Sequence, residues 1–230
     1  MANIAEAFYR QQKTADVFYA MQKHLRRVAF VQRCAGAPLI LPNYTDAVHA
    51  YNCAMTYVTL CTVHHHTPNA KIIIVLLTHD NLEAFTGDLL APVKDAISDK
   101  WDEVERQVQN RAADLAHIPI GSYEVFTQLF PRDEQMLGVL TTEEIFLVKI
   151  IDMYEFLVRM IEERSMGNKD RWVAQSICYG TRSLRERIHK LLEMQNATLE
   201  KEYADDIFTA YSAMITIHDL WSVVDYEEEC

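Results

Sequence analysis

A run of three histidines at residues 64–66 is the densest group of side chains here that could bind a metal ion. Cys61 lies three residues earlier, and Cys53 and His49 lie further back at helical spacing, so these side chains would share one face of a helix. Zinc takes four ligands in a closed site, however, and no Cys-x-x-Cys or His-Glu-x-x-His motif is present. A helix C-terminus also favours histidine through its dipole alone. We therefore predict no metal site and no cofactor, and the role of the histidine run stays open.

Two Arg–His pairs offer a second kind of chemistry. Arg182 and His189 are seven residues apart, and Arg111 and His117 are six apart. This spacing resembles the Arg-x4–6-His motif of HEPN-type helical ribonucleases, in which histidine would transfer a proton beside an arginine that stabilises charge on phosphate. The motif is loose, since one chain meets it twice. A helical ribonuclease is therefore only an alternative hypothesis.

Other catalytic patterns are missing from the sequence. The paired acids at 143–144, 162–163 and 205–206 are adjacent, so each pair splits across two helix faces. They lack the Glu-x-x-His spacing of di-iron bundles. The chain has no phosphate-binding glycine loop and no Gly-x-Ser-x-Gly turn. We therefore predict that the protein is not an enzyme.

Composition predicts a mainly helical protein. Half of the 230 residues are apolar, and glycine and proline together number only 12. Residues 45–63 are apolar nearly all round, which predicts a central helix buried by its neighbours. After a proline, residues 92–115 show helical periodicity. Residues 71–78, KIIIVLLT, suit either a buried strand or a buried helix. Residues 122–130 alternate in the manner of a β-strand.

The second half of the chain predicts three long helices after that strand. Thr141 and Glu144 have capping-box spacing, and Gly167 is placed to end the helix that follows. Further helices are expected at 169–194 and 198–224. The predicted fold is mainly α, with six or seven helices and at most one or two short strands. Residues 1–117 would form a helical region of unassigned role, and residues 118–230 a strand–helix–helix–helix region, or the two would form one continuous domain.

Charge is strongly segregated along the chain. The formal net charge is −11, yet residues 159–190 contain eight Arg and Lys against four Asp and Glu. In the helix expected at 169–194, one face is apolar and the opposite face is cationic. The cationic face suits phosphate or carboxylate geometry. Its candidate nucleic-acid contacts are Arg171, Arg182, Arg185 and Lys190.

The same region resembles the AcaB-like family of conjugative-element proteins. The resemblance covers about residues 118–195 and rests on FTQLFP, on YEFLVR with Arg164 and Gly167, and on GTRSLR at 180–185. It implies a dimeric DNA-binding activator of conjugative-transfer genes with a ribbon-helix-helix element at 122–195. In such an element a paired strand enters the major groove, so Thr127 or Gln128 would contact bases.

The leading hypothesis is thus a non-enzymatic, homodimeric transcriptional regulator with DNA as its partner. A helical adaptor that binds another protein of the transfer machinery is the second hypothesis. We expect a cytoplasmic location, because the N-terminus lacks a signal-peptide pattern and no apolar run reaches membrane-spanning length. Five scattered cysteines also favour a reducing compartment.

Overall fold

The computed structural model describes residues 19, 21–88, 100–115, 123–132 and 138–224. Those residues form helices joined by turns and loops, and their β-structure is limited to one isolated bridge between Gln32 and Thr45. The prediction of a mainly helical fold is confirmed. None of the helices in these ranges combines the length and the apolar character needed to cross a membrane.

The chain forms two compact units that alternate along the sequence. The first unit comprises Met1–Ala35, Thr45–Ala47 and Thr78–Met136. The second unit comprises Gly36–Tyr44, Val48–Leu77 and Leu137–Cys230. The domain boundary predicted at residues 117–118 lies outside the described residues and stays a prediction.

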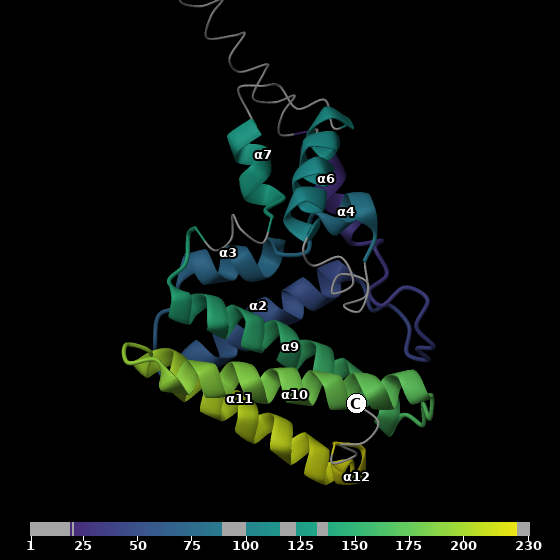
Figure 1. Ribbon diagram of the computed structural model, residues 1–230, viewed down its shortest axis with the longest axis vertical. Coiled ribbons are helices and arrows are strands. Elements are labelled where there is room, and N and C mark those ends of the chain that lie inside the picture. The colour runs from purple at the N-terminus through teal and green to yellow at the C-terminus, as the bar shows by residue number, and fades with distance from the viewer. Residues whose placement is uncertain (1–18, 20, 89–99, 116–122, 133–137, 225–230) are drawn as a thin grey trace, which may run out of the picture. The chain divides into compact units, whose positions relative to one another are not determined.

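The second unit is built on long helices. Figure 1 shows α9, α10 and α11 lying side by side. Helix α2 starts in the first unit and continues into the second, and all but the last residue of α3 belongs to the second. The bounds are α2 Asp46–Val63, α3 Ala70–Thr78, α9 Thr142–Ser165, α10 Arg171–Glu193, α11 Thr198–Ile217 and α12 Trp221–Val224.

Helices α9 and α10 pack closely because α10 has one apolar face. Val173, Ile177 and Leu184 recur at helical spacing on α10 and are fully buried. Gly180 lies on this face, where an added Cβ would come within 2.7 Å of Leu157 Cδ2 on α9. A side chain at position 180 would therefore require the Leu157 side chain to move.

The ends of α9 follow the predicted signals. The Thr141 hydroxyl accepts from the Glu144 backbone N–H, and the Glu144 carboxylate accepts from the Thr141 N–H, which completes a capping box. At the other end Gly167 has φ +96°, a conformation that L side chains rarely adopt. The capping and stop predictions are both confirmed.

The first unit contains shorter helices. Residues 21–28 are helical, and the named helices are α4 Glu83–Thr86, α6 Trp101–Leu115 and α7 Tyr123–Leu129. Their core is a cluster of buried apolar side chains, namely Met21, Leu82, Ala112, Ala113, Phe126 and Phe130.

The predicted strand at 122–130 is wrong, because residues 123–129 form helix α7. Phe126 and Phe130 are four residues apart, so a helix places both on one face. Both are fully buried and their rings stack at a centroid distance of 4.8 Å. Burial of this pair favours the four-residue period over the alternating one. The proposed ribbon-helix-helix element therefore has no strand.

Candidate active site

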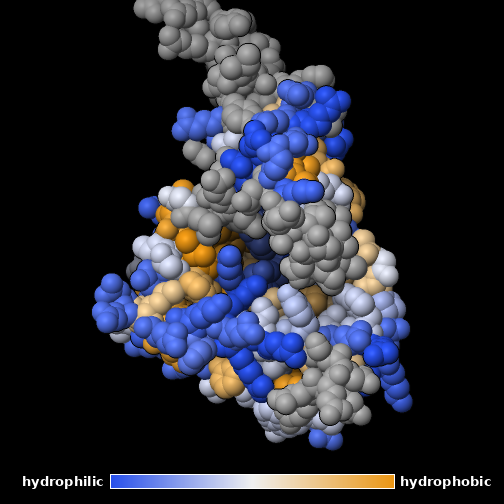
Figure 2. Space-filling view, viewed as in Figure 1, coloured by the Kyte–Doolittle hydropathy of each residue, from blue (hydrophilic) through white to orange (hydrophobic). Residues whose placement is uncertain are grey.

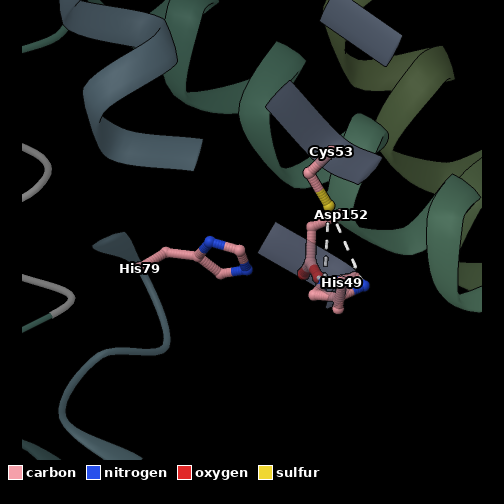
Figure 3. Close-up of side chains that lie close together, drawn as sticks. All are labelled: His49, Cys53, His79 and Asp152. Atoms are coloured by element: carbon pink, nitrogen blue, oxygen red, sulfur yellow. Dashed lines mark hydrogen bonds and ion pairs between the residues drawn. The ribbon is translucent and has the colours of Figure 1, made fainter. Parts of the chain in front are cut away.

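Three potential metal donors converge in the second unit. Helix α2 presents His49 and, one turn later, Cys53, and both are completely buried. Helix α9 presents Asp152 toward them (Figure 3). His49 Nε2 lies 2.9 Å from Asp152 Oδ1 and 3.4 Å from Cys53 Sγ. The three side chains thus bring a nitrogen, an oxygen and a sulfur donor to within 4.8 Å of one another.

The opposite edge of the His49 ring is held by Tyr44. The Tyr44 hydroxyl lies 3.4 Å from His49 Nδ1, a buried contact. The Arg159 guanidinium in turn lies 5.0 Å from the centroid of the Tyr44 ring, a cation–π contact. Because the second ring nitrogen is occupied by Tyr44, Nε2 faces Cys53 and Asp152. Metal-binding histidines are oriented in this way by their second nitrogen.

The loop before Tyr44 is fixed to α9 by one buried carboxylate. Glu163 is fully buried and accepts from the backbone N–H groups of Ile40 and Leu41 and from Asn168 Nδ2, each at 2.8 Å. Burial opposes its ionisation, but these hydrogen bonds and the charge of Arg159 outweigh that effect and lower the pKa of Glu163. The loop that carries Tyr44 is therefore anchored.

The first unit gathers a second set of polar side chains around Asp80. Arg33 is ion-paired with Asp80, and Arg33 Nη1 lies 3.8 Å from Asp46 Oδ1. The carboxylates of Asp46, Asp80 and Glu83 each offer an oxygen within 4.8 Å of the others. His79, the residue before Asp80, places Nε2 3.2 Å from Asp80 Oδ2.

The Asp46 carboxyl in this set is unusual. It is fully buried, and burial together with the charges of Asp80 and Asp88 raises its pKa to about 7, although Arg33 opposes the shift. A carboxyl with such a pKa can hold or release a proton near neutral pH. Perturbed acids of this kind often mark functional sites.

The predicted DNA-contacting residues do not form a site with these groups. Arg171, Arg182, Arg185 and Lys190 are exposed on α10, as the two-faced pattern predicted. Figure 2 shows mainly hydrophilic side chains over this helix. Thr127 and Gln128 lie in helix α7, where the Thr127 hydroxyl donates to the Glu124 carbonyl within the same turn. A base-reading ribbon is therefore not available.

The other sequence candidates are engaged elsewhere. His189 is exposed, with Nε2 3.3 Å from Glu193 Oε1, one turn further along α10. His117 lies outside the described residues. In the histidine run, His64 Nε2 lies 2.7 Å from Asp206 Oδ2 and His66 Nδ1 lies 3.0 Å from the Tyr203 hydroxyl. These side chains link the end of α2 to α11.

Sequence reasoning missed Asp152 and the adjacent pair His79–Asp80, and it gave His49 only a minor place. Two signals were present. Asp152 interrupts an apolar stretch of α9 directly after two fully buried residues, Ile150 and Ile151. His79 and Asp80 directly follow the apolar run of α3. Buried polar side chains need partners, so acids and histidines in such places indicate a site.

Comparison with known proteins identifies relatives of this chain. A family model described as 5'-deoxynucleotidase YfbR-like matches residues 18–195. The chain is 27% identical over 195 residues to the 5'-deoxynucleotidase Ent638_2835 of Enterobacter sp. (strain 638) and to the 5'-deoxynucleotidase YfbR of Salmonella typhi. Each alignment covers 80% of this chain and 87% of the relative. A crystal structure of an HD-domain phosphohydrolase from Listeria innocua has a similar fold, with a TM-score of 0.63 and 17% identity over 90% of this chain and 95% of that one.

These matches correct the functional predictions. The resemblance to the AcaB-like family is wrong, because the matched family is a different one and covers most of the chain. The same matches contradict all three proposed functions, namely a DNA-binding regulator of conjugation, an adaptor of a transfer machinery and a HEPN-like ribonuclease. They also contradict DNA and transfer proteins as the partners. The prediction of a non-enzyme is also wrong, since the matched family and the relatives are named as nucleotidases.

Proposed function

Because the chain belongs to the YfbR-like family of 5'-deoxynucleotidases, we propose that it is a phosphohydrolase that releases phosphate from a 5'-deoxynucleotide. The observation that carries this proposal is the contact of 2.9 Å between the buried His49 and the partly buried Asp152, with Tyr44 on the second ring nitrogen. A catalytic role accounts for this pair better than a structural one, because burying the ionisable His49 side chain is costly and the partly open Asp152 leaves the pair within reach of solvent. The cytoplasmic location predicted from the sequence is part of the proposal.

The donor set in the second unit fits a divalent cation. Imidazole nitrogen and carboxylate oxygen are the usual ligands of divalent transition metals in proteins, and here they are already oriented. His49 and Asp152 would hold the cation. When bound, it supplies a Lewis acid that polarises a phosphate oxygen and makes water a better nucleophile.

We also assign a role to the set of polar side chains around Asp80 in the first unit. Helix α2 links the two sets along the chain, since Asp46, whose carboxylate adjoins that of Asp80, precedes His49 by three residues. Within the first unit, His79 and Asp80 offer a nitrogen and an oxygen donor. Arg33 carries a planar guanidinium group that suits phosphate oxygens. Glu83 is the candidate for proton transfer to or from water.

Phosphate release from a panel of nucleotides tests the proposal. Purified protein should release phosphate from deoxynucleoside 5'-monophosphates when Zn²⁺, Co²⁺ or Mn²⁺ is supplied. The rate of phosphate release from deoxynucleoside 3'-monophosphates should be at least about tenfold lower, because their phosphate would not be oriented for attack by water. The His189→Ala variant, altered at an exposed position of α10, should match the parent. No release from any 5'-deoxynucleotide with any of these cations would contradict the proposed function.

A further inference from the structure

Cys53 is the one donor of the second-unit group that the proposed hydrolysis leaves without a task. It lies four residues after His49 on α2, so a single turn of helix presents both side chains on the same face. Cys53 is not part of a disulfide and has no exposed surface, and its sulfur is directed at the His49 ring (Figure 3). The sulfur lies 3.4 Å from Nε2, the same nitrogen that faces Asp152.

We propose that Cys53 is a thiolate ligand of the cation held by His49 and Asp152, and that it makes this centre select Zn²⁺ or Co²⁺ over Mg²⁺. The proposal rests on the proposed function only for the presence of the cation. Three donor atoms of different kinds already lie within 4.8 Å of one another, and two of them come from one rigid helix. On binding, the thiol releases its proton to solvent and the sulfur lone pair forms the bond to the cation.

Ligand type decides the metal preference. Thiolate is a soft ligand that favours zinc and its neighbours, whereas Mg²⁺ takes oxygen ligands almost exclusively. A thiolate beside imidazole and carboxylate therefore strengthens the preference for Zn²⁺ and Co²⁺ over Mg²⁺.

Two measurements on the full-length protein test the sulfur ligand. X-ray absorption of the zinc-loaded parent protein should show sulfur at about 2.3 Å beside nitrogen and oxygen at about 2.0–2.2 Å. The cobalt-loaded parent should show a near-ultraviolet thiolate-to-cobalt charge-transfer band. Cys53→Ser should abolish the band and weaken Zn²⁺ binding by at least about tenfold, with little change for Mg²⁺.

Cys61 provides the matched control. It is also buried and free, and it lies eight residues further along the same helix, so Cys61→Ser should keep the band and the zinc affinity. The X-ray measurement needs no variant and so does not depend on whether Cys53→Ser folds. A zinc site with only nitrogen and oxygen ligands would overturn the proposal, and hydrolysis of 5'-deoxynucleotides by that protein would leave the proposed function intact. A sulfur ligand in a protein that hydrolyses no 5'-deoxynucleotide would support the role of Cys53 and contradict the proposed function.

Discussion

Replacing Asp152 with asparagine should reduce phosphate release from a 5'-deoxynucleotide by at least about 100-fold. Loss of a side chain that only supports a metal ligand typically costs 10–100-fold, and Asp152 is proposed as a direct ligand. Asparagine keeps the size of the side chain and can still bond His49 Nε2, so the fold should be retained. The rate at saturating cation and substrate, measured beside the thermal unfolding curve, checks this expectation.

Asp205→Asn is the control for that experiment. Asp205 is an exposed acid on α11, and its replacement should leave both the rate and the unfolding curve unchanged. If Asp152→Asn retained the rate of the parent protein, Asp152 would have a structural role only, and the His49–Asp152 pair would no longer support catalysis.

Replacing Glu163 with alanine should lower the free energy of unfolding by about 3–5 kcal/mol, the usual cost of removing one member of a buried charged pair. The change leaves the backbone N–H groups of Ile40 and Leu41 and the amide of Asn168 without their acceptor. It also removes the carboxylate that lies 3.4 Å from Arg159 Nη2. Urea unfolding at neutral pH measures the loss.

The pH dependence of stability distinguishes the contribution of the Glu163 charge from that of the packing of its side chain. Because the pKa of Glu163 is lowered in the folded state, its carboxylate stabilises the fold fully above the ordinary pKa of 4.5. This stabilisation is lost as the pH falls through the lower pKa of the folded state. The stability gap between the parent and Glu163→Gln should therefore narrow below about pH 4.5. Glu162→Gln, at the neighbouring exposed position, should stay within about 0.5 kcal/mol of the parent. A Glu163→Gln variant as stable as the parent at neutral pH would rule out the anchoring role.

Much of the helical framework could be predicted from local signals. The capping box at Thr141, the stop at Gly167 and the apolar face of α10 each depend on residues within one or two turns, and the structure confirms them. The helix expected at 45–63 begins and ends within one residue of α2. Its side chains differ from expectation, because Tyr51 and Val63 are exposed rather than buried. An apolar composition does not by itself say which faces are covered.

The strand at 122–130 could not be excluded from local sequence. Its apolar residues satisfy an alternating period and a four-residue period at the same time. Phe126 and Phe130 are buried with Ala112 and Ala113 of α6, and that long-range packing decides the conformation. Single-segment reasoning does not contain this information.

The site was harder to predict than the fold because its residues are far apart in the sequence. In the sequence, 103 positions separate His49 from Asp152. No short motif joins these residues. The sequence-based search for a site instead considered the clustered histidines at 64–66 and the cationic face of α10. Density of reactive residues along a chain is a weak guide when helices bring together single residues from distant turns.

The central claim is that hydrolysis depends on a cation held by His49 and Asp152. Its most direct test is phosphate release from a 5'-deoxynucleotide by protein freed of metal with a chelator and then titrated with Co²⁺, for the parent and for His49→Ala. We predict no release before the addition, a rate that rises in proportion to bound cation in the parent, and no such rise in His49→Ala. Equal rates in the metal-free and metal-loaded parent, or an unchanged titration in His49→Ala, would contradict the claim.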